Sequence, residues 1–433
     1  MFLTGFALYL GMDEVMLGVL ASMPFMVTIF QLPASYIIGK TGKRKQISCG
    51  AAAIARSIWI PILAVSLLPS LWANEKLFII LGMIFISYAF VSISYVSWLS
   101  WLSELVPEGM RGRFFGTRNM LCGAAGMIAM VVFGRLLDNL NGHVLRGLPL
   151  GFGITFISAV FFGMVSLRFL NRISEPQQSG RFNHTVTLRS LIILPFKENN
   201  FRRFLIYAIA WGFSVNFASP FFTLYFLRDL RFSYSFIAIL GMISALADLL
   251  AMQLWGRISD RVKNKVVIQA SSWVAVFLPL AWVSARPEGA VIPIALHITG
   301  GAFWAGINLC TSNILLRISP QKERPSFIAI YSIMAGLGSA IGPILSGFSL
   351  SFLNEFGLSL FSWKVLPLQT IFIASSLFRL LSLQLFKYVH EPEEVRFGQM
   401  VRILRSVRGL NVANGYNYLL HPFIEISGTR QKS

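Results

Sequence analysis

The chain has 433 residues, of which 55% are hydrophobic and 13% are charged, and its formal net charge is +19 at pH 7. A soluble protein of this size usually carries about 25% charged residues, so the composition excludes an ordinary soluble domain and indicates a bilayer as the main solvent. The basic residues lie in short segments between long apolar runs, and this arrangement argues against nucleic-acid binding as the meaning of the positive charge.

Eleven runs of the chain are long and apolar enough to cross a bilayer as helices, since such a helix needs about 20 mostly apolar residues. They cover roughly residues 14–38, 47–69, 77–102, 116–137, 147–170, 203–227, 234–255, 266–285, 291–316, 325–350 and 365–387. The opening stretch, Phe2 to Leu10, provides about half of a further span. We therefore predict an all-α membrane protein with twelve helices, the first of them partial. We also expect the native start to lie upstream of Met1; a decayed gene is the alternative.

The basic residues predict the orientation of these spans. Of the 37 Lys and Arg residues, 28 fall in segments on the same side as the loop at 39–46, and seven fall on the other side. Because Lys and Arg concentrate in cytoplasmic loops, this asymmetry predicts an inner-membrane protein with the 39–46 loop in the cytoplasm. Both termini of the complete protein would then be cytoplasmic.

One long polar connection, residues 171–202, divides the runs into two sets. We interpret it as a cytoplasmic linker between an N-terminal six-helix half, residues 1–170, and a C-terminal six-helix half, residues 203–388. The remaining residues, 389–433, form a tail.

Two loops recur in the two halves in the same order. Pro107 and Arg111 in the first half match Pro320 and Arg324 in the second, 213 residues later, and the Lys40 to Arg44 segment also has a basic counterpart. A repeat of this kind indicates a duplicated fold with a central site between the halves.

The basic counterpart reads Gly256-Arg-Ile-Ser-Asp260-Arg261-Val-Lys-Asn-Lys265. It resembles the G-x-x-x-D-R-x-G-R-R loop of the major facilitator superfamily, which follows the second and the eighth helix of those transporters. Glycine allows close helix approach, and the charged cluster can hold one conformation and release another.

The first copy of this loop keeps Lys40, Gly42 and Arg44, but it has Ser35 and Gly39 where the family pattern has glycine and aspartate. The resemblance covers residues 1 to about 388. It implies a monomer of twelve helices whose two halves rock around a central solute site, without a cofactor.

The resemblance further implies that helices one, four, seven and ten line that site. The polar and aromatic candidates on these helices are Tyr88, Tyr95, Trp98, Trp211, Asn216, His297, Trp304 and Asn308. In the tenth helix, three of them recur at helical spacing and share one face. Such a cavity suits a neutral or weakly charged amphipathic organic solute. The alternative for each aromatic residue is packing or a place at the lipid interface.

Charged residues inside spans are costly and often functional. Asp248 is the single acid deep within a run, and we consider it a candidate for coupling to a proton or a sodium ion. An ion pair with a nearby basic side chain is its structural alternative. Arg56 is a weaker candidate, and we expect Arg379 to extend its charge to the cytoplasmic interface.

In the tail, Phe397, Met400 and Leu404 fall on one helical face with arginines around it. This pattern predicts a basic amphipathic helix that binds anionic lipids. A partly ordered tail is the alternative.

Two classes of function remain. The first is a secondary transporter of a small organic solute, coupled to an ion gradient, since the sequence holds no G-x-x-x-x-G-K-[ST] motif for nucleotide binding. The second is a binding or scaffold protein that kept the fold and lost transport. We find no catalytic motif, and the three cysteines lack metal-ligand spacing.

Overall fold

The computed structural model describes residues 1–67, 73–140, 142–145, 148–175, 188–287, 289–321, 323–356 and 366–391. Within these residues, eleven helical stretches are long and apolar enough to cross a membrane. They run from Glu14–Thr41 to Pro367–Phe386 and coincide with the eleven predicted runs. The prediction of an all-α, multi-pass membrane protein is therefore confirmed. The basic amphipathic helix predicted in the tail, around Phe397, Met400 and Leu404, lies outside the described residues.

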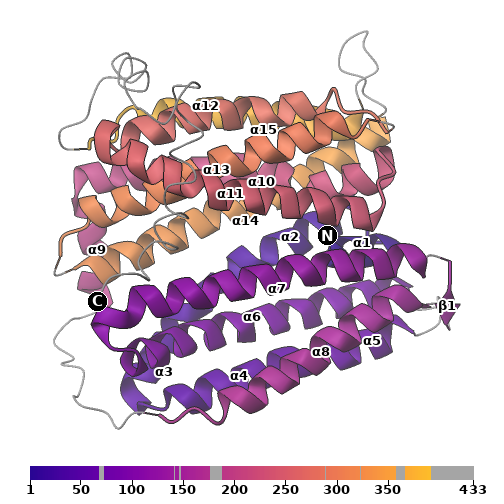
Figure 1. Cartoon of the computed structure of the whole chain (residues 1–433), viewed down its shortest axis with the longest axis horizontal. Helices are drawn as coiled ribbons and strands as arrows, with labels where there is room; N and C mark the ends of the chain where they lie inside the picture. Colours follow the sequence, from indigo (N-terminus) through magenta and orange to yellow (C-terminus); the bar gives the residue numbers. More distant parts are fainter. Residues whose placement is uncertain are drawn as a thin grey trace, which may run out of the picture.

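The helices fall into two bundles (Figure 1). The N-terminal bundle contains α1 Phe2–Tyr9, α2 Glu14–Met26, η1 Val27–Phe30, α3 Gln31–Thr41, α4 Arg44–Ser57, α5 Trp59–Ser66, α6 Ala73–Leu105, η3 Glu108–Met110, α7 Arg111–Asn139 and α8 Leu150–Leu170. A two-stranded hairpin of β1 Val144–Leu145 and β2 Leu148–Pro149 precedes α8. The C-terminal bundle contains α10 Asn199–Leu224, the π-helical turn η4 Tyr225–Asp229, α11 Tyr234–Val262, α12 Asn264–Trp282, α13 Val291–Ile318, α14 Arg324–Phe356 and α15 Pro367–Phe386. Between the bundles in sequence, α9 Leu188–Lys197 packs on α10 and α14.

Local sequence determines where the helices begin, break and end. The Asp13 carboxylate accepts a hydrogen bond from the Met16 amide at 2.7 Å and so caps α2. The third span is divided into α4 and α5 because Pro61 cannot donate to Ser57, four residues earlier, and its ring crowds that carbonyl. At the end of α3, Gly42 adopts a left-handed conformation with φ 68°, which closes the helix.

The bundles have two ends, which we name by their residues. The basic end holds the connections from α3 to α4, from α6 to α7, from α11 to α12 and from α13 to α14. The Glu14 end holds the start of α2 and the connection from η4 to α11. Successive spans alternate in direction, so each predicted loop motif lies at the basic end.

The two bundles are joined through small residues toward the Glu14 end. Gly18 of α2 lies against the Pro343 carbonyl of α14, and a Cβ added to Gly347 would lie 2.6 Å from the Glu14 carbonyl. On the other side of the interface, a Cβ on Gly134 of α7 would lie 3.0 Å from the Tyr234 carbonyl at the start of α11. These contacts bring helix backbones together without intervening side chains.

Polar contacts reinforce the same end. The Arg228 guanidinium pairs with the Glu14 carboxylate at 3.2 Å, and the Asn354 amide donates to the same carboxylate at 2.8 Å. The Asp138 carboxylate of α7 accepts from the amides of Tyr234 and Ser235 at 2.9 and 2.8 Å, and thereby caps α11 across the interface.

Toward the basic end the bundles diverge, as Figure 1 shows for α7 below and α11 above. Gly116, Gly123 and Gly126 of α7 have open space where a Cβ would stand, with no described atom within 4 Å. The two buried apolar clusters of the described residues are distributed in the same way. One buried cluster combines residues of both bundles, such as Phe6 with Phe217, whereas a second cluster, which includes Phe201, comes from the C-terminal bundle and α9 within the described residues.

We predict that Gly18→Ala destabilises this arrangement by about 1–3 kcal/mol, the usual cost of overpacking. The added methyl group would overlap the Pro343 carbonyl, and neither backbone can withdraw without separating the bundles. Thermal unfolding of the detergent-solubilised protein measures the change. Gly82→Ala is the matched control, because nothing described lies within 4 Å of its Cβ position. Equal unfolding temperatures for both variants would show that the α2–α14 contact does not hold the bundles.

Candidate functional site

Four of the predicted residues line one cavity in the C-terminal bundle. This cavity, of about 330 Å³, lies among α10, α13 and α14. Its walls include Trp211, Asn216, Trp304 and Asn308, and the rings of Trp211 and Trp304 lie 6.0 Å apart. The lining also includes five residues that carry hydroxyl groups: Tyr207, Thr311, Ser312, Tyr331 and Ser339. Of the three α13 candidates at helical spacing, Trp304 and Asn308 line this cavity and His297 does not.

A second cavity of about 460 Å³ adjoins the first, since Val215 and Trp304 line both. It extends among α10, η4, α11, α12, α13 and α15, and His297 lies in its wall. The His297 Nδ1 lies 2.9 Å from the Pro293 carbonyl, so this nitrogen donates its hydrogen to the backbone of its own helix. The ring packs edge-on against Trp282 at 5.3 Å.

Arg379 also lines this second cavity, and the prediction that it extends to the interface is wrong. Its side chain is buried, with the whole residue 4% exposed, and its Nη1 donates to the Ala275 carbonyl of α12 at 2.7 Å. The sequence shows that Arg379 lies toward the basic end of its helix, but not that it faces inward between α12 and α15.

A third cavity, of about 350 Å³, lies in the N-terminal bundle and holds Tyr95 and Trp98. The two rings are stacked at 6.3 Å, and the Arg118 guanidinium lies 4.4 Å from the centre of the Trp98 ring. Arg56 lines the same cavity and donates to the Gly163 carbonyl of α8 at 2.5 Å. Tyr88, in the middle of α6, does not line this cavity and packs against the buried cluster that combines residues of both bundles.

Asp248 lies in the middle of α11, half-buried. Within the described part of the chain its carboxylate makes no hydrogen bond and no ion pair, and it lines none of the three cavities. The ion pair considered as its structural alternative is thus absent from the described residues.

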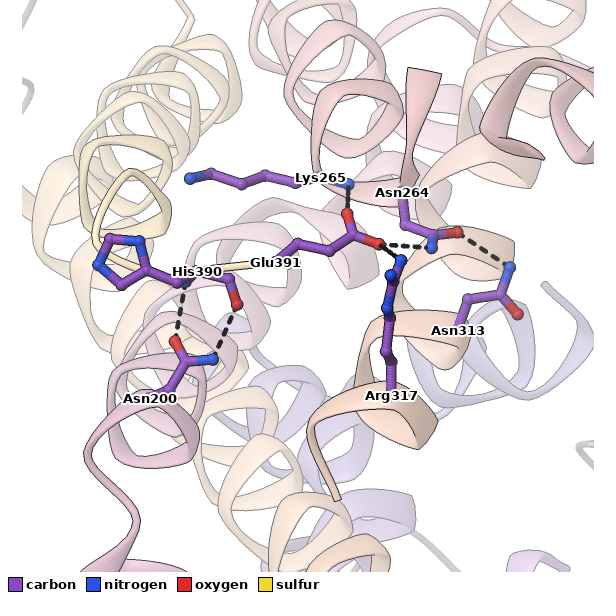
Figure 2. Close-up of polar contacts among 7 residues, drawn as sticks. All are labelled: Asn200, Asn264, Lys265, Asn313, Arg317, His390 and Glu391. Atoms are coloured by element: carbon purple, nitrogen blue, oxygen red, sulfur yellow. Dashed lines mark hydrogen bonds and ion pairs between the residues drawn. The ribbon is translucent and has the colours of Figure 1, made fainter. Parts of the chain in front are cut away.

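The loop motif of the C-terminal bundle surrounds a carboxylate that our sequence analysis did not identify. Glu391 lies in the segment that follows α15, is 3% exposed and reaches the first turn of α12 (Figure 2). It accepts hydrogen bonds from the Lys265 amide at 2.7 Å, from the Asn264 side chain at 2.8 Å and from Arg317 at 3.1 Å. The charge lies at the positive end of the α12 dipole and pairs with a cation at the end of α13, so it joins three helices.

Neighbouring amides extend this cluster. The Asn313 side chain donates to Asn264 at 3.0 Å, and Asn200 exchanges two hydrogen bonds of 2.8 Å with the backbone of His390 (Figure 2). By contrast, Gly256 lies on the side of α11 nearest Leu309, while Asp260 and Arg261 are exposed. The aspartate and arginine of the family pattern therefore do not form the buried part of this cluster.

The N-terminal bundle has a related cluster in which the end of the fourth helix carries an acid instead of a base. The buried Arg44 pairs with Glu104 at the end of α6, and the matching position in the C-terminal bundle is Arg317. The Lys45 amide donates to Glu175 at 3.0 Å, as the Lys265 amide does to Glu391. Lys40, in the last turn of α3, is exposed.

Of the recurring loop residues, Arg111 has a defined structural role. It donates to the carbonyls of Ser103 at 2.6 Å and Val106 at 3.1 Å, and so caps the end of α6. Pro107 and Pro320 are exposed, and Arg324 begins α14.

A sequence signal could have identified the carboxylates of Glu175 and Glu391, which our sequence analysis did not consider. Each glutamate is followed by a proline, and the two Glu-Pro pairs follow the sixth and the twelfth helix.

Comparison with known proteins identifies relatives of this arrangement. The family model of the Major Facilitator Superfamily matches residues 1–313 and 204–424. A search of curated proteins finds no significant match.

Among solved structures, the nucleoside transporter NupG superposes with a TM-score of 0.66 at 16% identity, covering 89% of this chain and 93% of its own. A bacterial homologue of the human lysosomal transporter Spinster, inward-facing and occupied, gives 0.65 at 13% identity, covering 90% and 93%. The inward open xylose transporter XylE from E. coli gives 0.62 at 14% identity, covering 90% and 89%. At these identities the likeness shows the fold alone.

We predict that Glu391→Gln lowers the stability of the protein by about 2–3 kcal/mol, because it removes charge-assisted hydrogen bonds from a buried acceptor. Glu175→Gln is the matched control: it makes the same exchange at an exposed carboxylate, where we expect about 1 kcal/mol or less. Thermal unfolding in detergent compares the two. Equal losses of stability in the two variants, or no loss in Glu391→Gln, would contradict the interpretation that Glu391 stabilises the contact of α12 and α13 with the segment after α15.

Proposed function

The chain belongs to the Major Facilitator Superfamily, and from this premise we propose that it is a secondary transporter that moves a small organic solute by alternating access. It is a multi-pass membrane protein with a transporter fold. Solute, coupling ion and mechanism are the parts that we propose.

The single observation that carries the proposal is the asymmetry between the two ends of the bundles. Gly18 and Glu14 join the bundles at one end, while α7 and α11 diverge at the other. Between the ends, the cavity walls present indole rings, amides and hydroxyl groups of the kind that bind organic molecules. Such an arrangement suits one of two states that exchange by rocking.

In the reverse state the contacts at the Glu14 end would separate. The Glu14 carboxylate would leave Arg228 and Asn354, and the free halves of α7 and α11 would approach each other. Because the basic end carries most of the Lys and Arg residues, we place it in the cytoplasm of a cell with an inner membrane. The described conformation then opens inward.

Ion coupling is assigned to Asp248. A carboxylate in the middle of a span with no described partner favours binding of a proton or a sodium ion. Its position on α11, a helix of the moving interface, supports a link between ion occupancy and rocking.

The second candidate function is a binding or scaffold protein without transport. The incomplete loop motif of the N-terminal bundle favours it, since Gly39 stands where the family pattern has an aspartate. The two candidates differ in whether both ends of the bundles open.

We predict opposite distance changes at the two ends. Spin labels at Thr117 and Gln253, both exposed, report the basic end, and labels at the exposed Val144 and Val291 report the Glu14 end. The labels are placed in a variant without the three native cysteines and measured in liposomes by pulsed dipolar spectroscopy. Transport by alternating access requires two populations at each end, and the long distance of one pair must coincide with the short distance of the other.

Gly18→Ala supplies a perturbation for this measurement, because it crowds the Glu14 end and should increase the population that is closed at the basic end. A single population at both ends, unchanged by Gly18→Ala and by an imposed proton gradient, would support the scaffold function instead.

We further predict that Asp248→Asn separates exchange from accumulation. With a solute identified by thermal stabilisation of the protein, the variant should retain counterflow in proteoliposomes but lose at least about 90% of gradient-driven uptake, since the amide cannot carry the ion. Gly82→Ala serves as the control for expression and reconstitution. Full accumulation by Asp248→Asn would remove Asp248 from the coupling step.

A further inference from the structure

We propose that the ligand of the 460 Å³ cavity is a small organic carboxylate with a flat apolar body, and that Arg379 pairs with its carboxylate. The inference deepens the proposed function, and it rests on that function only in treating the ligand as the transported solute.

The geometry of Arg379 leaves one side of its guanidinium unused. Nη1 is engaged by the Ala275 carbonyl at 2.7 Å, whereas Nε is buried and has no hydrogen-bond partner among the described residues. Nε belongs to the edge of the guanidinium that forms two-point pairs with carboxylates. The side chain that carries it lines the cavity.

The charge of Arg379 is not neutralised by the cavity. Arginine stays protonated in proteins, and a buried cation is costly unless it is paired. None of the described residues that line the three cavities is acidic, while three of them are arginines, namely Arg56, Arg118 and Arg379. An anionic ligand provides the missing charge, which a neutral solute would not.

The remaining wall selects the body of the ligand. Phe222, Trp282 and Trp304 supply flat apolar surface, and the wall also includes the two serines Ser219 and Ser244. A volume of about 460 Å³ holds one molecule with one or two rings. Trp304 and Val215 also line the neighbouring cavity, so the two cavities adjoin at these side chains.

The cavity of the N-terminal bundle also carries positive charge, which supports an anionic solute. Arg118 is exposed on α7, in the half of that helix that diverges from α11, and lies over Trp98. A cation above an aromatic ring at this position attracts organic anions from the basic end. The Nη1 of Arg56 is bonded to a backbone carbonyl in the same way as that of Arg379.

The test measures binding to the full chain in detergent by calorimetry. The probes are benzoate, phenylacetate and naphthoate, each compared with its primary amide, together with phenyl phosphate. We expect at least one carboxylate to bind about tenfold or more tightly than its amide, the usual difference for a hydrogen-bonded charge pair.

Arg379→Gln should reduce this preference to about unity, and Arg379→Lys should retain part of it. Arg168→Gln, the same exchange at an exposed site on α8, is the control for net charge and should keep the full preference. If Arg379→Gln does not fold, the wild-type comparison and Arg379→Lys decide the matter.

Three results would overturn the assignment: no carboxylate preferred over its amide in the wild type, a preference that survives Arg379→Gln, or binding of phenyl phosphate alone. Loss of the preference in Arg56→Gln but not in Arg379→Gln would likewise overturn it. Counterflow of the bound carboxylate in liposomes separates the two proposals. Binding without counterflow leaves the assignment intact and contradicts transport, whereas transport of solutes that lack an acid contradicts the assignment alone.

Discussion

The structure depends on one constraint of the bilayer, which offers no water to a polar group left without a partner. Every span must satisfy its backbone as a helix, and helices surrounded by lipid gain little from apolar contact alone. Close backbone approach then becomes the main source of attraction between the bundles. Gly18, Gly134 and Gly347 provide that approach, and they do so toward one end only. The open end of the described arrangement is the end that lies away from these glycines.

The same constraint explains where charge is found. At the basic end, carboxylates cap helices and pair with arginines. In each bundle, a glutamate in the segment after the last helix accepts a hydrogen bond from the first turn of the third helix. Inside the bundles, charge without a protein partner is rare and therefore informative. Asp248, Arg56 and Arg379 make no ion pair within the described spans, and the two arginines are each bonded to a backbone carbonyl. In the transport that we propose, the cation at Asp248 and the anion at Arg379 therefore occupy separate places, because these residues lie on different helices.

The sequence predicted the fold well, since about 20 apolar residues between polar loops leave few alternatives to a spanning helix. The assignment of the candidate residues to a solute site stays a prediction. Trp304 and Asn308 of α13 line one cavity within the C-terminal bundle, whereas Tyr88 packs against the buried cluster shared by both bundles and Arg379 is buried rather than at the interface. A span that is apolar on all sides does not reveal which face meets lipid. Glu391 was missed because its partners lie far away in sequence and no periodicity links them.

The position of Glu391 has a consequence for biosynthesis. Its hydrogen bond to Lys265 spans 126 residues, and the corresponding bond from Lys45 to Glu175 spans 130. Each amide enters the membrane region long before the ribosome has delivered its acceptor. This contact of the third helix in each bundle can therefore form only after the sixth helix of the same bundle has been synthesised. The contact of the first bundle becomes possible while the second bundle is still being made.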